Sequence, residues 1–212
     1  MLLLACTLAL TAALVLLLLL TRTGRWNGQR ENAQLLTLVN AAHPLPERQN
    51  REYTLLDDGQ MVDQRCAGDL QLMLADCRAA GGEPVIARAL VTRAEQADLF
   101  AAELAVQLAR GLEEEQARAA AARAVPPPGQ SEHELGLAVD LRDEGDTAEL
   151  TQRWLAENSW RYGLILRYPE GKSEITGRDG NPWHFRYVGQ EAARQIVELD
   201  ITLEEYIELF YS

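Results

Sequence analysis

The chain has 212 residues, of which 47% are hydrophobic, and a formal net charge of −12 at pH 7. This length is enough for one substantial hydrophobic core but hardly for two. Proteins that bind the phosphate backbone of nucleic acids present basic surfaces, so the acidic balance of this chain argues against that class of partner. We therefore predict one folded domain and no nucleic-acid partner.

The N-terminal segment is strongly apolar. Leu2–Leu20 contains no charged residue and no proline, and about 20 apolar residues are enough to span a bilayer. A cleaved signal peptide would show a basic start and a shorter apolar stretch. We predict one N-terminal transmembrane helix at residues 1–21, an anchor or signal-anchor, followed by a polar juxtamembrane linker at residues 22–34.

The folded part is expected over residues 35–212. Apolar residues at helical spacing predict a helix over residues 63–80, and a strand is expected over residues 84–91. Thr92 and Glu95 have the spacing of a capping box, which opens a helix that extends to about residue 111.

Further elements follow from the same kind of pattern. Strands are expected at 138–141, 164–167 and 185–188, and helices at 113–124, 147–158, 190–199 and 203–211. Because strands and helices do not alternate regularly, we predict the α+β class, with a central, mostly antiparallel sheet flanked by helices.

His133, Asp140 and His184 form the most informative set of side chains. Two imidazoles and a carboxylate suit Zn²⁺, and three protein ligands leave a fourth position open, as in catalytic zinc sites. A loop carrying His133 could fold back over a strand carrying Asp140, with Gly136 permitting the tight backbone. The alternative is that both histidines are hydrogen-bonded structural residues and Asp140 caps a strand end.

The motif around these residues resembles that of a known family. Ser131-x-His133-x-x-Gly-x-Ala-x-Asp140, followed by Pro-Trp183-His184-x-Arg186, is similar to the signature of the VanY-type D-alanyl-D-alanine carboxypeptidases, a family of zinc peptidases. The same resemblance extends over about residues 35–212, through segments that include 38–46, 62–65, 96–100, 166–177 and 183–189.

The resemblance implies a zinc site on loops and strand ends, with Zn²⁺ as cofactor and His133, Asp140 and His184 as ligands. It further implies removal of a C-terminal D-alanine from peptidoglycan stem peptides or their precursors. Ser131 and Arg186 match family positions that line the site and are expected to bind substrate, the alternative being that each is a cap or a surface charge, and Trp183 is expected to bind substrate as well.

The general base is the first departure from the family pattern. The family has a glutamate three residues before the last histidine, where this chain has Asn181. An amide cannot accept a proton at neutral pH, so Asn181 could orient a water molecule but not activate it. Asp179 is a candidate substitute, with Glu174 also close in sequence, although a solvated turn aspartate is the alternative reading of Asp179.

The second departure concerns substrate binding. The family's arginine, which grips the terminal carboxylate of the substrate, aligns with Val91, and valine offers neither charge nor a hydrogen bond. Arg88 or Arg93 could supply the charge from a shifted register, but a strand shift of odd length points side chains to the opposite face.

These observations leave three hypotheses. The first, which we favour, is a membrane-anchored zinc D,D-carboxypeptidase with impaired or altered activity. The second is a catalytically degenerate relative that binds zinc and a peptide terminus as a sensor or scaffold. The third is a structural protein that has lost its metal, which the intact ligand set argues against.

The location of the domain follows from its substrate. Arg22, Arg25 and Arg30 follow the apolar segment, and the positive-inside rule would place the domain in the cytoplasm. Stem peptides of assembled cell wall lie outside the membrane, however. We therefore expect a single-pass protein of the cell membrane with an extracytoplasmic domain.

Overall fold

The computed structural model describes residues 33–47 and 49–211, and the chain divides into two compact units, residues 1–37 and 38–212. The anchor expected at residues 1–21 and nearly all of the expected linker lie outside the described residues. Residues 33–35 are helical. Within the described part of the chain, no helix is both long and apolar enough to cross a membrane.

A four-stranded antiparallel sheet forms the centre of the second unit. Its strand order is β3-β4-β6-β5, and every neighbouring pair is antiparallel. This confirms the predicted α+β class with an antiparallel sheet. The strands are β3 (Val85–Arg88), β4 (Ala138–Arg142), β5 (Leu164–Tyr168) and β6 (Asn181–Tyr187).

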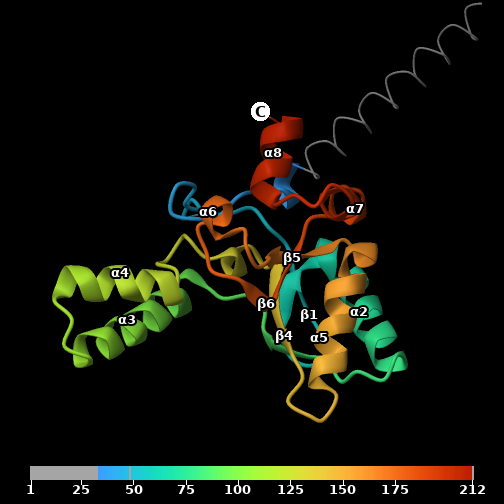
Figure 1. Ribbon diagram of the computed structural model, residues 1–212, viewed down its shortest axis with the longest axis horizontal. Coiled ribbons are helices and arrows are strands. Elements are labelled where there is room, and N and C mark those ends of the chain that lie inside the picture. Colours follow the sequence, from blue (N-terminus) through green and yellow to red (C-terminus); the bar gives the residue numbers. More distant parts are fainter. Residues whose placement is uncertain (1–32, 48, 212) are drawn as a thin grey trace, which may run out of the picture. The chain divides into compact units, whose positions relative to one another are not determined.

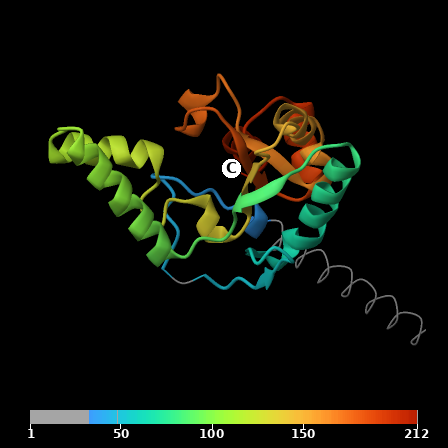
Figure 2. The same cartoon turned by 90° about the horizontal axis from the view of Figure 1, so that it is seen from below.

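Helices lie on both sides of this sheet. In Figures 1 and 2, α2 and α5 lie on one side of the strands, and the hairpin of α3 and α4 projects from the other. The longer helices are α2 (Gln64–Ala79), α3 (Arg93–Ala109), α4 (Glu114–Ala124), α5 (Ala148–Asn158), α7 (Gln190–Glu198) and α8 (Leu203–Tyr211). The predicted helices are thus confirmed to within a few residues at their ends.

Short elements escaped prediction because three or four residues are too few to show a period. They are β1 (Tyr53–Leu55) and β2 (Met61–Asp63), which form a separate two-stranded sheet, the 3₁₀ helices η1 (Glu132–Leu135) and η2 (Ser159–Tyr162), and α6 (Ser173–Thr176).

The hydrophobic core includes side chains of α2, α5 and the central strands. Leu70, Met73, Leu141, Leu155 and Phe185 are all fully buried. Burial of one such side chain stabilises the fold by roughly 1.5–3 kcal/mol. The core therefore holds β4 and β6, the two central strands, in a fixed position.

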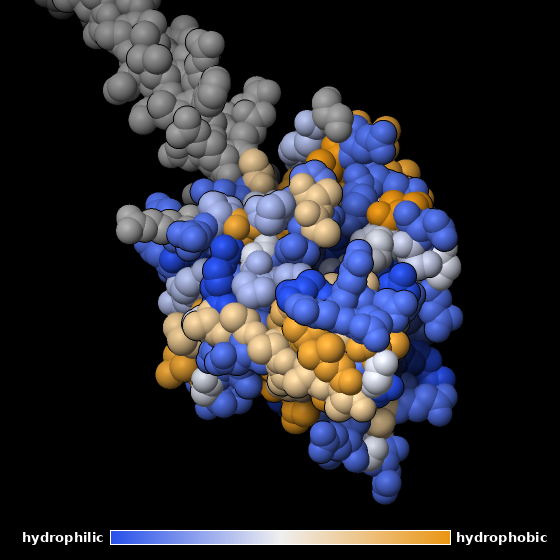
Figure 3. All heavy atoms as spheres, turned by 90° about the vertical axis from the view of Figure 1, so that its left-hand side faces the viewer, coloured by the Kyte–Doolittle hydropathy of each residue, from blue (hydrophilic) through white to orange (hydrophobic). Residues whose placement is uncertain are grey.

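The α3–α4 hairpin contributes little to this core. Val106 and Leu108 are 44% and 43% exposed, and Figure 3, which views the molecule from this side, shows apolar side chains on its surface. The predicted capping box is present, since Thr92 Oγ1 accepts a hydrogen bond from the backbone N–H of Glu95 and the Glu95 carboxylate accepts one from the backbone N–H of Thr92. The capping box thus fixes the residue at which α3 begins.

Strand β6 begins earlier than predicted. The strand was expected from residue 185, but it starts at Asn181, which pairs with Tyr168 of β5. The register of the β5–β6 pair shifts between Leu166 and Tyr168, and such irregularities are where a sheet accommodates proline. This early start places Asn181 and His184 on one strand.

Candidate metal centre

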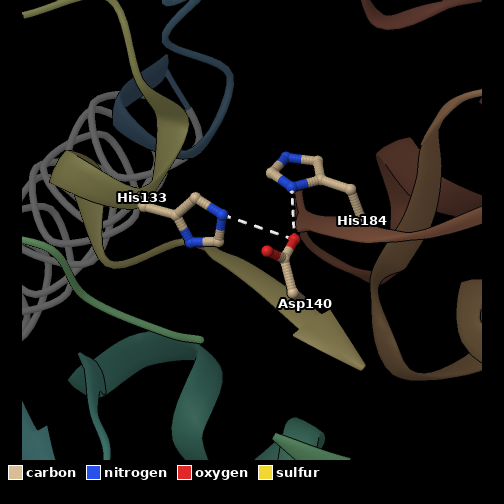
Figure 4. A group of neighbouring side chains, drawn as sticks. All are labelled: His133, Asp140 and His184. Carbon is tan, nitrogen blue, oxygen red and sulfur yellow. Dashed lines mark hydrogen bonds and ion pairs between the residues drawn. The ribbon is translucent and has the colours of Figure 1, made fainter. Parts of the chain in front are cut away.

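His133, Asp140 and His184 converge at one end of the β4–β6 pair (Figure 4). One ligand atom from each lies within 4.8 Å of the others. The Asp140 carboxylate lies between the two rings, with Oδ1 3.4 Å from His133 Nε2 and 2.9 Å from His184 Nδ1. All three residues are buried.

The backbone explains this convergence. Asp140 on β4 and His184 on β6 are direct partners in the antiparallel register. His133 lies on η1, which ends at Gly136 in the left-handed conformation, with φ of 70°. A Cβ at Gly136 would approach the backbone nitrogen of Asp63 to 2.9 Å, so only glycine allows the chain to turn there from η1 into β4.

The second nitrogen of each imidazole is also engaged. His133 Nδ1 lies 2.8 Å from the carbonyl oxygen of Ala89, and His184 Nε2 lies 3.3 Å from Oε2 of Glu132. Acceptors of this kind fix the tautomer and orientation of metal-binding histidines. They leave His133 Nε2, Asp140 Oδ1 and His184 Nδ1 facing one point, a donor set that fits Zn²⁺.

The electrostatics favour the metal-binding forms of His133 and Asp140, whereas, against the effect of burial, the two neighbouring carboxylates raise the pKa of His184 in the absence of a metal. Burial lowers the pKa of His133 and therefore favours its neutral form. Burial raises the pKa of Asp140, but hydrogen bonds with His133 and His184 outweigh it, and the net effect is a pKa well below the usual range. A neutral imidazole and an ionised carboxylate are the forms that bind a metal.

A buried charge network surrounds Glu132, which the sequence analysis did not identify as a site residue. Arg167 Nε and Arg186 Nη1 both donate to Oε1 of Glu132, at 2.8 and 2.9 Å. Burial raises the pKa of Glu132, but the two guanidinium groups outweigh it and hold the pKa well below its ordinary value. Glu132 is therefore an ionised acceptor for His184.

A cavity of about 260 Å³ opens onto the ligands. Four of the residues singled out from the sequence line it together with the ligands, namely Arg88, Ser131, Asn181 and Trp183. Arg142 and Arg178 also line the cavity, and their guanidinium groups lie over the rings of Trp183 and Tyr168, respectively. The space is thus small, polar and rich in arginine.

Five other residues singled out from the sequence do not line this cavity, namely Val91, Arg93, Glu174, Asp179 and Arg186. Val91 borders a separate hollow beside α3, and Asp179 borders another beside α6. Arg186 was expected to bind substrate, but its side chain is fully buried and donates to Glu132 and to the carbonyl oxygen of Tyr187. The guanidinium of Arg186 therefore lies in the charge network of Glu132, away from the lining of the cavity, and its expected role in substrate binding stays a prediction.

Arg88 enters the cavity because the register of β3 against β4 is irregular. The pairing shifts between Ile86 and Arg88, and Arg88 lies opposite Asp140. The strand ends there, so the alternation of faces does not continue to Val91, whose backbone N–H instead donates to the carbonyl oxygen of His133. Arg93 is directed elsewhere, towards Glu134 and the carbonyl oxygen of Leu45.

Among the described residues that line the cavity, the carboxylates are Glu132 and Asp140. Both already face histidines, so neither matches the free general base of the family. Asn181 borders the cavity, and its Oδ1 accepts a hydrogen bond from the backbone N–H of Trp183 at 3.2 Å. The amide is thereby held in place at the position where the family has its glutamate.

Comparison with known proteins gives consistent matches. Residues 59–190 match the VanY family, described as D-alanyl-D-alanine carboxypeptidase. A D-alanyl-D-alanine carboxypeptidase of Enterococcus faecalis (strain ATCC 700802 / V583) is 40% identical over 187 residues, covering 87% of this chain and 69% of that protein.

Solved structures agree with this match. VanYB in complex with D-alanine-D-alanine has a TM-score of 0.78 and 41% identity, covering 82% of this chain and 98% of the other. A point mutant of the D,D-pentapeptidase VanY from a VanB-type resistance cassette, in complex with Zn(II), has a TM-score of 0.77 and 42% identity, covering 82% of this chain and 99% of the other.

Proposed function

Since this chain belongs to the VanY family of D-alanyl-D-alanine carboxypeptidases, we propose that it is a zinc-dependent carboxypeptidase that removes the C-terminal D-alanine of peptidoglycan stem peptides. The observation that carries the proposal is the convergence of His133, Asp140 and His184 on one point of a cavity lined by arginines. The matched proteins are named for peptidase activity, so the comparisons do not support the alternative that this chain is a degenerate family member that only binds peptide.

The chemistry is divided between the metal and the chain. When bound by the three ligands, zinc supplies a Lewis acid that polarises a carbonyl and lowers the pKa of water to roughly 7. Asn181 is placed to orient a water molecule through its amide but cannot take up its proton. General acid–base help is worth about 10²–10⁴ in rate, so we propose a hydrolysis that is slower than in an enzyme with a glutamate at this position.

Arg88 is the best placed group to receive the terminal carboxylate of a peptide. Its guanidinium has no hydrogen bond, ion pair or ring contact with any other residue in the described part of the chain, whereas Arg142 and Arg178 each lie over an aromatic ring. An unpaired guanidinium beside a metal can bind a carboxylate through two parallel hydrogen bonds. Arg88 would thus take the role of the arginine that the family has at the position of Val91.

The test of the activity is D-alanine release from a peptide ending in D-Ala-D-Ala, with zinc-loaded protein and a chelated sample as control. Release that the chelator abolishes is the expected result. If the protein holds one zinc per chain but releases no D-alanine, and peptides with other termini also fail, the proposal is wrong and a binding role replaces it.

The role of Arg88 is tested with Arg88→Ala. A hydrogen bond to a charged group is worth about 1.5–3 kcal/mol, so the variant should lose roughly 10- to 150-fold in kcat/KM. Amidation of the peptide's C-terminus should cost the wild-type enzyme a similar factor and the variant little. Arg118→Ala, which removes an exposed arginine of α4 that pairs with Glu114, is the matched control.

The proposed location follows from the proposed substrate. Stem peptides of assembled cell wall lie outside the membrane, and Leu2–Leu20 is an uncharged apolar run. We therefore propose an extracytoplasmic domain held by this segment. A reporter enzyme that is active only outside the membrane, fused after Ser212, should be active. Activity of a reporter that works only in the cytoplasm, fused at the same point, would contradict the proposal.

A further inference from the structure

The C-terminal helix α8 makes an ion pair with the buried charge network behind the metal ligands (α8 is red in Figure 1). Arg167 Nη1 and Nη2 donate to the two carboxylate oxygens of Glu204, at 2.9 and 2.5 Å. The Arg167 side chain is 1% exposed and that of Glu204 is 16% exposed. Such a bidentate pair fixes the plane of the guanidinium as well as its position.

The same guanidinium reaches Glu132 from its other edge. Arg167 Nε donates to Oε1 of Glu132, which also accepts from Arg186. With Oε1 held by two cations, the carboxylate is oriented so that Oε2 faces Nε2 of His184. A continuous chain of charge-assisted contacts therefore runs from Glu204 through Arg167 and Glu132 to a metal ligand.

Charge balance makes Glu204 part of this arrangement. Two carboxylates, those of Glu132 and Glu204, face two buried guanidinium groups, those of Arg167 and Arg186. Removing the charge of Glu204 would take from Arg167 one of the two carboxylates that it contacts, and its guanidinium would then draw more strongly on Glu132. That carboxylate would then attract the N–H of His184 less strongly, and its plane would lose one of its constraints.

We propose that Glu204 is a positioning residue for the metal centre, which acts through Arg167 and Glu132 to set the orientation and donor strength of His184. The C-terminal helix is then part of the machinery that determines zinc affinity, although it contributes no ligand. Residues that hydrogen-bond a ligand directly typically change metal affinity by about 10- to 100-fold when mutated, and because Glu204 acts through Arg167 and Glu132 we expect the lower end of that range.

The experiment compares Glu204→Gln with Glu208→Gln. Both remove one negative charge from α8, and Glu208 is exposed one turn further along the helix. Zinc dissociation constants are measured by competition with a chromophoric chelator, without peptide, so the outcome is independent of the proposed activity. We expect Glu204→Gln to weaken zinc binding about tenfold or more and Glu208→Gln to leave it within about twofold of wild type.

The absorption spectrum of the Co²⁺-substituted protein gives the second readout. It should shift in Glu204→Gln, because the donor strength of His184 changes, and not in Glu208→Gln. A zinc dissociation constant within about twofold of wild type for Glu204→Gln would overturn the proposal. If that variant does not fold, Glu204→Asp decides, since its shorter side chain cannot hold Arg167 in the same plane, and wild-type affinity there would equally refute it.

Discussion

At the scale of single residues, we propose that Asn181 limits how fast this site can work. The residue borders the cavity three positions before His184 and holds an amide where a proton acceptor is needed. Asn181→Glu should therefore raise D-alanine release by at least tenfold, because general base help is worth about 10²–10⁴. Asn181→Gln lengthens the side chain equally without adding a base and should bring no gain. If the glutamate variant binds zinc and is no faster, Asn181 is not the defective element.

His184 is the proposed ligand that contacts two buried carboxylates. Its Nδ1 faces Asp140 and its Nε2 faces Glu132. His184→Ala leaves two ligands, and we expect it to abolish stoichiometric zinc binding, measured by metal analysis after gel filtration. His43→Ala removes an exposed histidine that contacts Asn40 and should keep one zinc per chain. Full occupancy in His184→Ala would refute the ligand assignment.

At the scale of an element, Asp143 ties the loop after β4 to the start of α5. Its carboxylate accepts hydrogen bonds from the hydroxyls of Thr147 and Thr151 and from the backbone N–H groups of Gly145 and Glu83. These hydrogen bonds, that from Thr147 above all, lower the pKa of Asp143 to about 2.

A pKa that is lower in the folded state has a defined consequence for stability. The contribution of Asp143 is complete above the unfolded pKa of roughly 4 and is lost as the pH falls towards about 2. Asp143→Asn should therefore lower the urea midpoint of unfolding at pH 6, and the difference from wild type should shrink between pH 4 and pH 2. Asp146→Asn, in the same loop, should behave like wild type, whereas a pH-independent difference for Asp143→Asn would contradict the linkage.

The elements of the fold differ in how far they can be predicted from the sequence. Long helices such as α3 repeat their pattern over several turns and were predicted closely, and the ligands were found because a motif carries them. The network of Glu132, Arg167 and Glu204 was not found, because the three residues are far apart in the chain and no local pattern marks a charged residue for burial. Register irregularities, which bring Arg88 and Asn181 into the cavity, are likewise set by tertiary packing.

At the scale of the whole molecule, zinc should cross-link three segments that the chain otherwise holds by packing and by the hydrogen bonds between β4 and β6. The ligands come from η1, β4 and β6, and unfolding separates them, so the metal binds the folded state in preference. Free zinc at a thousandfold excess over its dissociation constant should stabilise the fold by about 4 kcal/mol. For a protein of this size that corresponds to a rise in Tm on the order of 10 °C. Calorimetry with zinc and with chelator measures it, and His184→Ala should show little of the rise. An equal rise in that variant would mean that zinc stabilises the protein from another site.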